Sequence, residues 1–224
     1  MRSLVLGFAT LLALAAKSAC VDAAIIVGGI SFDDNAFVDT VIQENSPLFP
    51  FYGALTVSDA LVGSNPANGV DLLTGSVLLG FTDNLVVNGT GSDLALFEGG
   101  PLFSPPPEGF VVSLSVSGLS TPGEFVVVPV SDTGFNAASN DSILVGYLDL
   151  SSLGLPVGAT INQIAIATDI ATAVVGGADL TVVGAINNSS PVVPEPASLA
   201  IWSMLGLVGV GVGWRRRSRK LSQV

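Results

Sequence analysis

No lysine, arginine or histidine occurs between residues 24 and 193 of this 224-residue chain, and this absence limits what the chain can form. All seven basic residues lie nearer the two ends, whereas sixteen of the eighteen acidic residues lie inside the stretch. The stretch therefore carries a formal charge of −16 and cannot form an internal salt bridge. Such a charge repels nucleic acid, so we expect no nucleic-acid partner, and any cation that compensates the carboxylates must come from solution.

The same stretch contains no cysteine, methionine or tryptophan. Cys20 is the only cysteine of the chain and lies before the stretch, so no disulfide can stabilise it. Its core has to consist of Val, Ile, Leu, Ala and Phe side chains. The stretch is long enough for one domain with a core of ordinary size.

Short β-rich runs separated by Gly, Asn, Asp and Pro predict an all-β fold. The runs are residues 76–81, 110–117, 124–131, 143–150, 161–168 and 180–186. Asn88-Gly89 lies between two further apolar runs and predicts a hairpin turn. We expect residues 24–186 to form an antiparallel β-sandwich, jelly-roll-like, with about eight to ten strands.

The N-terminal segment, residues 1–23, has the order of a secretory signal peptide. Arg2 precedes an apolar run at residues 4–16, and small residues follow as far as the expected cleavage point. A lipoprotein signal would use Cys20 instead, but Lys17 stands where such a signal requires a branched apolar residue. We therefore expect the chain to be exported.

The C-terminal segment begins with a turn-prone spacer, residues 187–196. The spacer ends in Val193, Pro194, Glu195 and Pro196. Prolines favour extended backbone and remove hydrogen-bond donors, so this motif should stay accessible to a processing enzyme.

An apolar run at residues 197–214 and a basic tail at residues 215–224 follow the spacer. As a helix the run would span about 27 Å, which is adequate for one C-terminal transmembrane helix. The expected membrane anchors are Trp202, Trp214, Arg215, Arg216 and Arg217. A plain membrane anchor behind a proline-rich spacer would have the same parts.

These last thirty or so residues resemble the PEP-CTERM sorting signal, in which a Pro-Glu-Pro motif, a membrane helix and a basic cluster stand in this order. The resemblance implies an exosortase as partner, a membrane-embedded cysteine protease or transpeptidase that removes the tail near Pro194–Pro196. It also implies a Gram-negative bacterium, transient residence in the inner membrane, and later a place at the cell surface or in an exopolysaccharide or biofilm matrix.

The body resembles a loose class of bacterial surface proteins whose jelly-roll domains accompany such tails. The resemblance rests on a Gly-rich turn with the following strand (residues 89–98), on residues 147–150 and 154–160, and on residues 178–187. The class usually has a second acidic residue where this chain has Thr181, which weakens a metal assignment by resemblance.

The side chains of the body exclude most catalytic sites. Without His, Cys or Lys the body cannot form a serine triad, a thiol nucleophile or a histidine-bound zinc site. Glycoside hydrolysis needs only two carboxylates, but no spacing singles out a pair, and tryptophan, which is common in sugar-binding clefts, is absent. We expect no enzymatic activity.

Calcium is the cofactor hypothesis that suits this composition, because calcium binds six to eight hard oxygens in irregular geometry. Asp33 and Asp34 follow the first expected strand and Asp179 begins the last, so the three could share a site where the ends of a sandwich meet. They could equally be separate surface carboxylates.

The sequence thus predicts a noncatalytic surface or matrix protein that passes through the membrane before processing. Two alternatives from other classes remain open. One is a carbohydrate-binding module that holds a matrix exopolysaccharide, for which Phe51, Tyr52 and Phe103 are the suggestive aromatics. The other is a glycoside hydrolase.

Overall fold

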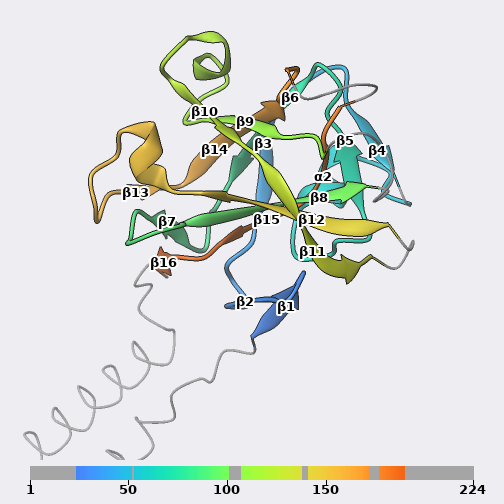
Figure 1. Cartoon of the computed structure of the whole chain (residues 1–224), viewed down its shortest axis with the longest axis horizontal. Coiled ribbons are helices and arrows are strands. Elements are labelled where there is room, and N and C mark those ends of the chain that lie inside the picture. Colours follow the sequence, from blue (N-terminus) through green and yellow to red (C-terminus); the bar gives the residue numbers. More distant parts are fainter. Residues whose placement is uncertain (1–23, 52, 101–106, 138–140, 172–176, 190–224) are drawn as a thin grey trace, which may run out of the picture. The chain divides into compact units, whose positions relative to one another are not determined.

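The computed structural model of the chain describes residues 24–51, 53–100, 107–137, 141–171 and 177–189 (Figure 1). The expected signal peptide, sorting motif, transmembrane helix and basic tail lie outside these ranges. Within them, strands in antiparallel sheets dominate, and the only α-helix is α2 (Val57–Leu61), with two 3₁₀ turns, η1 (Gly118–Ser120) and η2 (Leu150–Leu153). No helix of the described part has the length and apolar character that a membrane crossing requires.

Two large sheets contain most of the strands. The five-stranded sheet has the order β10 (Phe125–Val128), β9 (Phe110–Ser113), β14 (Gln163–Thr168), β6 (Ser76–Gly80) and β3 (Thr40–Asn45). The six-stranded sheet has the order β11 (Val130–Asn136), β12 (Ser142–Leu148), β8 (Leu94–Gly100), β15 (Asp179–Ala185), β5 (Gly69–Asp71) and β4 (Phe49–Phe51). A small sheet joins β13 (Thr160–Ile161), β7 (Leu85–Val87) and β16 (Asn188–Ser189), and β1 (Ile25–Val27) pairs with β2 (Ile30–Phe32).

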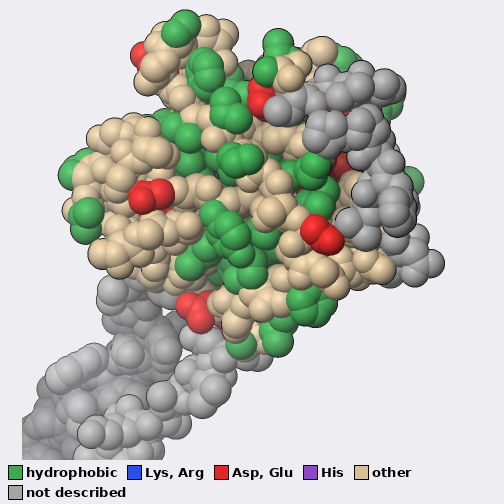
Figure 2. All heavy atoms as spheres, in the orientation of Figure 1, with side chains coloured by type: hydrophobic (Ala, Val, Ile, Leu, Met, Phe, Trp, Pro, Cys, Tyr) green, Lys and Arg blue, Asp and Glu red, His purple; other side chains and the backbone are tan. Residues whose placement is uncertain are grey.

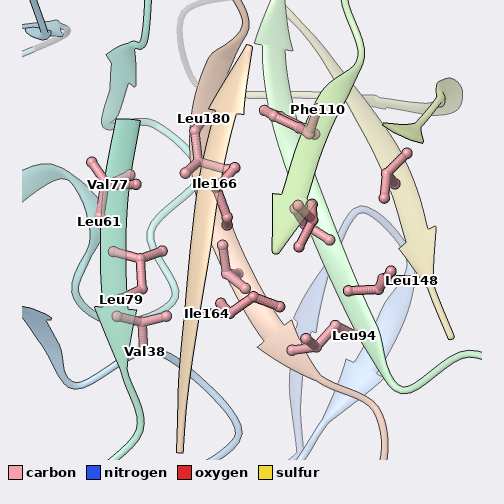
Figure 3. Packing of buried hydrophobic residues seen from close by; sticks show 14 of the residues in the cluster. Val38, Leu61, Val77, Leu79, Leu94, Phe110, Leu148, Ile164, Ile166 and Leu180 are labelled. Carbon is pink, nitrogen blue, oxygen red and sulfur yellow. The ribbon is translucent and has the colours of Figure 1, made fainter. Parts of the chain in front are cut away.

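The main core lies between the two large sheets. Leu94 and Leu96 of β8 belong to the same buried cluster as Ile164 and Ile166 of β14, on the other sheet (Figure 3). Because side chains alternate along a strand, the residues of β8 and β14 that enter this cluster are two positions apart. As the sequence predicts, aliphatic residues and phenylalanine, here Phe81 and Phe110, form it.

A second cluster covers the outer face of the six-stranded sheet. Ala95 and Phe97 of β8 point away from the main core and pack under the β1–β2 hairpin. The ring of Phe32 lies 6.0 Å from that of Phe97, centroid to centroid, in an edge-on arrangement. All seven residues of β8 are therefore buried, which explains why this strand is apolar on both faces instead of alternating.

The hairpin turn approaches β8 closely. Gly28 has a φ of 54°, and a Cβ atom there would lie 3.0 Å from the Phe97 ring. Both the backbone conformation and the lack of space favour glycine at this position.

All six predicted runs contain strands, but two of them end early. β9 stops at Ser113, although the alternating pattern continues to Ser117. The Ser113 hydroxyl accepts a hydrogen bond from the Ser115 backbone N–H, and the Ser115 hydroxyl accepts one from Gly118 N–H. Serine side chains of this kind compete with the sheet for backbone donors. In the 143–150 run, β12 gives way to η2 at Leu150.

The prediction of a hairpin turn at Asn88-Gly89 is wrong. β7 pairs with β13 and β16, whereas β8 pairs with β12 and β15, so the two strands flanking Asn88-Gly89 lie in different sheets. The Gly89 backbone N–H donates to the Asp93 carboxylate instead of closing a two-residue turn. The small sheet also takes in Asn188 and Ser189, which the sequence assigns to the spacer.

Candidate functional site

The residues of the sorting motif and its anchors lie outside the described residues. These are Val193, Pro194, Glu195, Pro196, Trp202, Trp214, Arg215, Arg216 and Arg217. The chain divides into two compact units after Ser189, so the motif and the body belong to different units.

Within the body, the segments that carry the jelly-roll resemblance meet. They contribute β12, β8 and β15, which are neighbours in the six-stranded sheet. Asp93 lies immediately before β8 and is fully buried.

The Asp93 carboxylate accepts three hydrogen bonds from three separate segments. One oxygen accepts from Gly89 N–H (2.7 Å) and from the Asn187 side-chain amide (2.8 Å), and the other accepts from Leu150 N–H (2.8 Å). A buried carboxylate is stable only when its lone pairs are satisfied in this manner. Asp93 therefore joins the turn before β8, the start of η2 and the end of β15, and its role is structural.

Asn88 extends this network and is also fully buried. Its side-chain amide donates to the Leu155 carbonyl (2.8 Å) and accepts from the Ser151 hydroxyl (3.2 Å). The Asp149 carboxylate accepts from Ser151 N–H and caps η2. The Asp149 carboxylate, like that of Asp93, therefore accepts a hydrogen bond from a backbone N–H group.

The structure does not bring together the three residues of the calcium hypothesis. Asp33 and Asp34 are exposed and precede Ala36, whose carbonyl accepts a hydrogen bond from Ala185 at the end of β15. Asp179 is at the other end of that strand. Six residue steps at about 3.3 Å each place the two ends roughly 20 Å apart.

Asp34 lies instead near Asp39 and Asp83. The Asp39 carboxylate accepts hydrogen bonds from the backbone N–H groups of Thr82 and Asp83. Partial burial raises the pKa of Asp83, and the charges of Asp39 and Asp34 raise it further. The backbone bonds show that Asp39 fixes the turn between β6 and β7.

Asp179 belongs to a second acidic group, which the sequence does not single out. Burial raises its pKa to about 7, and Asp71, Glu108 and Asp141 add to the effect. Burial raises the pKa of Glu98 to about 8, with further contributions from Glu108 and Asp179. The feature of the sequence that could have pointed to this acidic group is Glu98, an acidic residue inside an otherwise apolar strand.

Neither acidic group contains a ready-made metal centre of several carboxylates. Among the described residues, no three or more His, Cys, Asp or Glu side chains are placed to hold a metal ion together. On the face shown in Figure 2 the acidic side chains are scattered, and no basic side chain accompanies them.

A groove of about 430 Å³ lies against the five-stranded sheet. Val111 and Val127, whose side chains point away from the main core, form part of its floor, and Leu119 of η1 forms part of a wall. The groove also presents Phe125 and the polar side chain of Asp169. It combines apolar and polar surface of the kind that small polar ligands contact.

Comparison with known proteins gives a match in the C-terminal tail. A family model described as the PEP-CTERM protein-sorting motif matches residues 192–217. The match covers the whole Pro-Glu-Pro motif, the apolar run and the first three arginines of the basic cluster. No curated protein and no solved structure matches the chain.

Proposed function

We propose that this chain, a carrier of the PEP-CTERM protein-sorting motif, is a noncatalytic surface or matrix protein that an exosortase sorts and processes. The motif indicates exosortase-dependent sorting of an exported protein. The match over residues 192–217 is the observation that carries the proposal, because it joins the Pro-Glu-Pro motif to the apolar run and the arginines in one signal.

Each part of the signal has a distinct role in this proposal. The prolines at Pro194 and Pro196 keep the backbone extended for the enzyme, and residues 197–214 hold the chain in the membrane. Arg215, Arg216 and Arg217 keep the C-terminal end on the cytoplasmic side by the positive-inside rule. The body then lies on the outer side of the inner membrane until the tail is removed.

We infer that the exported body is a jelly roll, and the order of its strands supports this. Eight strands, β5, β6, β8, β9, β10, β12, β14 and β15, follow one another along the chain in this order. Each step passes to the other large sheet except the step from β9 to β10, which are neighbours in the five-stranded sheet. In one sheet β15 lies between β5 and β8, and in the other β14 lies between β6 and β9. Two interlocked Greek keys produce this interleaving.

The expected role of the body is attachment within an exopolysaccharide or biofilm matrix. Its formal charge of −16 over residues 24–193 keeps it soluble after release from the membrane, and it has no disulfide that reduction could break. Asp93 and Asp149 bind backbone groups, which fits a structural body better than a pair of catalytic carboxylates.

Processing by the exosortase can be tested in the native host. The full chain is produced in parent cells and in cells without their exosortase, and its mass and location are compared. We expect a shortened surface form in the parent and an unprocessed membrane form in the mutant. The triple variant Pro194→Ala/Glu195→Ala/Pro196→Ala should stay in the membrane unprocessed even in parent cells, which contain the exosortase.

The control for this experiment is Pro191→Ala, which removes a proline just outside the matched residues. Pro191→Ala should be processed normally. Equal processing with and without the exosortase would refute the proposal.

Carbohydrate binding is a second candidate, and the groove on the five-stranded sheet favours it. Phe125 would contact a sugar ring, while the exposed Thr74 and Ser120 of the same groove offer polar atoms. The aromatics proposed from sequence are less suitable, since Phe51 packs over Gly69, and Tyr52 and Phe103 lie outside the described residues. Binding to host exopolysaccharide that Phe125→Ala abolishes and Phe135→Ala preserves would support this candidate.

A further inference from the structure

Glu98 is a buried carboxylate with one oxygen left unpaired. The residue is 4% exposed, and its Oε2 atom has no hydrogen-bond partner in the described structure. A backbone hydrogen bond from Glu108 reaches the carboxyl group, but burial and nearby charges outweigh it. An unpaired carboxylate oxygen at this depth is costly unless a proton or a cation compensates it.

The surroundings of Glu98 add negative charge. In the antiparallel register Glu98 lies opposite Leu180, so Asp179 is next to its partner on the neighbouring strand. The negative charges of Glu108, just before β9, and of Asp179 raise the pKa of Glu98. The charges of Asp71 and Glu108 raise the pKa of Asp179 in the same way. Four segments of the chain thus bring carboxylates to the same end of the body.

The body itself supplies no cation to this end. Residues 24–193 contain no lysine, arginine or histidine, so no internal side chain can neutralise the group. A positive partner has to be bound from solution.

We propose that Glu98 and Asp179 bind one divalent cation of the calcium type at this end of the body. The two carboxylates supply the charge, and backbone carbonyls and water complete a shell of six to eight oxygens, as calcium accepts. A shell of this composition needs no cluster of three ready-placed carboxylates, which the described residues lack. Asp33 and Asp34 take no part, because they lie toward the other end of β15.

Calcium-dependent stability tests this site. The full chain is purified in detergent, stripped with a chelator, and melted with and without calcium at mildly alkaline pH. Calcium in about hundredfold excess over Kd should raise Tm by roughly 5–10 °C. Glu98→Gln and Asp179→Asn should each lose most of this shift. Neither should melt below the unchanged chain when calcium is absent, because the first removes a buried charge and the second a partly buried one.

Glu124→Gln is the matched control, because Glu124 is exposed and lies in the loop before β10. Its calcium shift should equal that of the unchanged chain. An unchanged chain that does not respond to calcium would overturn the proposal, and so would variants at Glu98 and Asp179 that keep the full shift. If Glu98→Gln melts higher than the unchanged chain and the unchanged chain does not respond to calcium, a proton and not a metal compensates the carboxylate, and the proposal is overturned.

Discussion

Asp93 and Glu98 are buried carboxylates only five residues apart, yet their surroundings are opposite. Three donors satisfy Asp93, while Glu98 keeps an unpaired oxygen and has acidic neighbours. The hydrogen bonds to Asp93 stabilise the native fold. The unpaired oxygen of Glu98 makes stability depend on a proton or a cation that compensates its charge.

Replacement of Asp93 should be among the most destabilising single changes in the body. Asp93→Ala leaves the donors of Gly89, Leu150 and Asn187 without their acceptor. At about 1–3 kcal/mol for each unsatisfied group, partly relieved by water, we expect a loss of roughly 3–5 kcal/mol in the free energy of unfolding. Urea unfolding measures the loss, and the exposed Glu124→Gln should stay within about 0.5 kcal/mol. A loss below about 1 kcal/mol in Asp93→Ala would contradict the structural role.

Glu98 should make the metal-free chain less stable as pH rises. The pKa of Glu98 in the folded state is about 8, above its ordinary value of 4.5, so between these values the folded chain keeps a proton that the unfolded chain has released. This contribution to stability is fully present below pH 4.5 and is lost as pH rises through 8. The loss is on the order of 1.4 kcal/mol per pH unit for one carboxyl. Asp179, with a pKa of about 7, acts in the same direction.

Urea unfolding at several pH values, with chelator present, measures this effect. Glu98→Gln removes the titrating group and should flatten the decline toward alkaline pH. A decline of the same slope in Glu98→Gln and in the unchanged chain would show that other groups cause it.

Residue periodicity and composition predict the strands but not their partners. The runs around β6, β10, β12, β14 and β15 are recognisable because each strand is a compact apolar segment. The prediction of a hairpin at Asn88-Gly89 is wrong because a two-residue pattern contains no information on distant partners. The Asn88 side chain donates to the Leu155 carbonyl, and the Gly89 N–H donates to the Asp93 carboxylate.

The acidic sites were harder to predict than the strands for the same reason. Asp179 was recognised from its position at a strand start, but its neighbours Glu108 and Asp141 come from elsewhere in the chain. Only the register of β8 against β15 shows that Asp179 accompanies Glu98 and not Asp33 or Asp34. Long-range pairing of this kind leaves no trace in a single sequence.

The β1–β2 hairpin should contribute to stability through Phe32. Its ring packs 6.0 Å from Phe97 and 5.2 Å from Phe37, and the residue is 3% exposed. Phe32→Ala should lower the free energy of unfolding by about 3–5 kcal/mol, because it opens a cavity over β8. Thermal and urea unfolding measure the change. Ile26→Ala, on the same hairpin but 70% exposed, should cost little, and equal costs would exclude the hairpin as a structural layer.

For the whole molecule, the uneven distribution of charge is the dominant physical feature. The body carries only negative side chains, and the positive ones lie in the two end segments. Like charges on a folded body repel each other more than those on an expanded chain, and dissolved salt screens this repulsion.

Moderate salt should therefore raise the stability of the body. We expect the melting temperature to increase from low to roughly physiological ionic strength in sodium chloride, with chelator present to exclude divalent cations. A melting temperature that falls over this range at neutral pH would mean that repulsion among the carboxylates does not limit stability.

We expect the C-terminal tail to act as a sorting signal and to be absent from the mature protein. Mass spectrometry of the C-terminus of surface material from the native host tests this most directly. We predict an end between about residues 192 and 197, either free or joined to another molecule. Surface-localised protein that still ends at Val224 would contradict the account and would make the tail a permanent anchor.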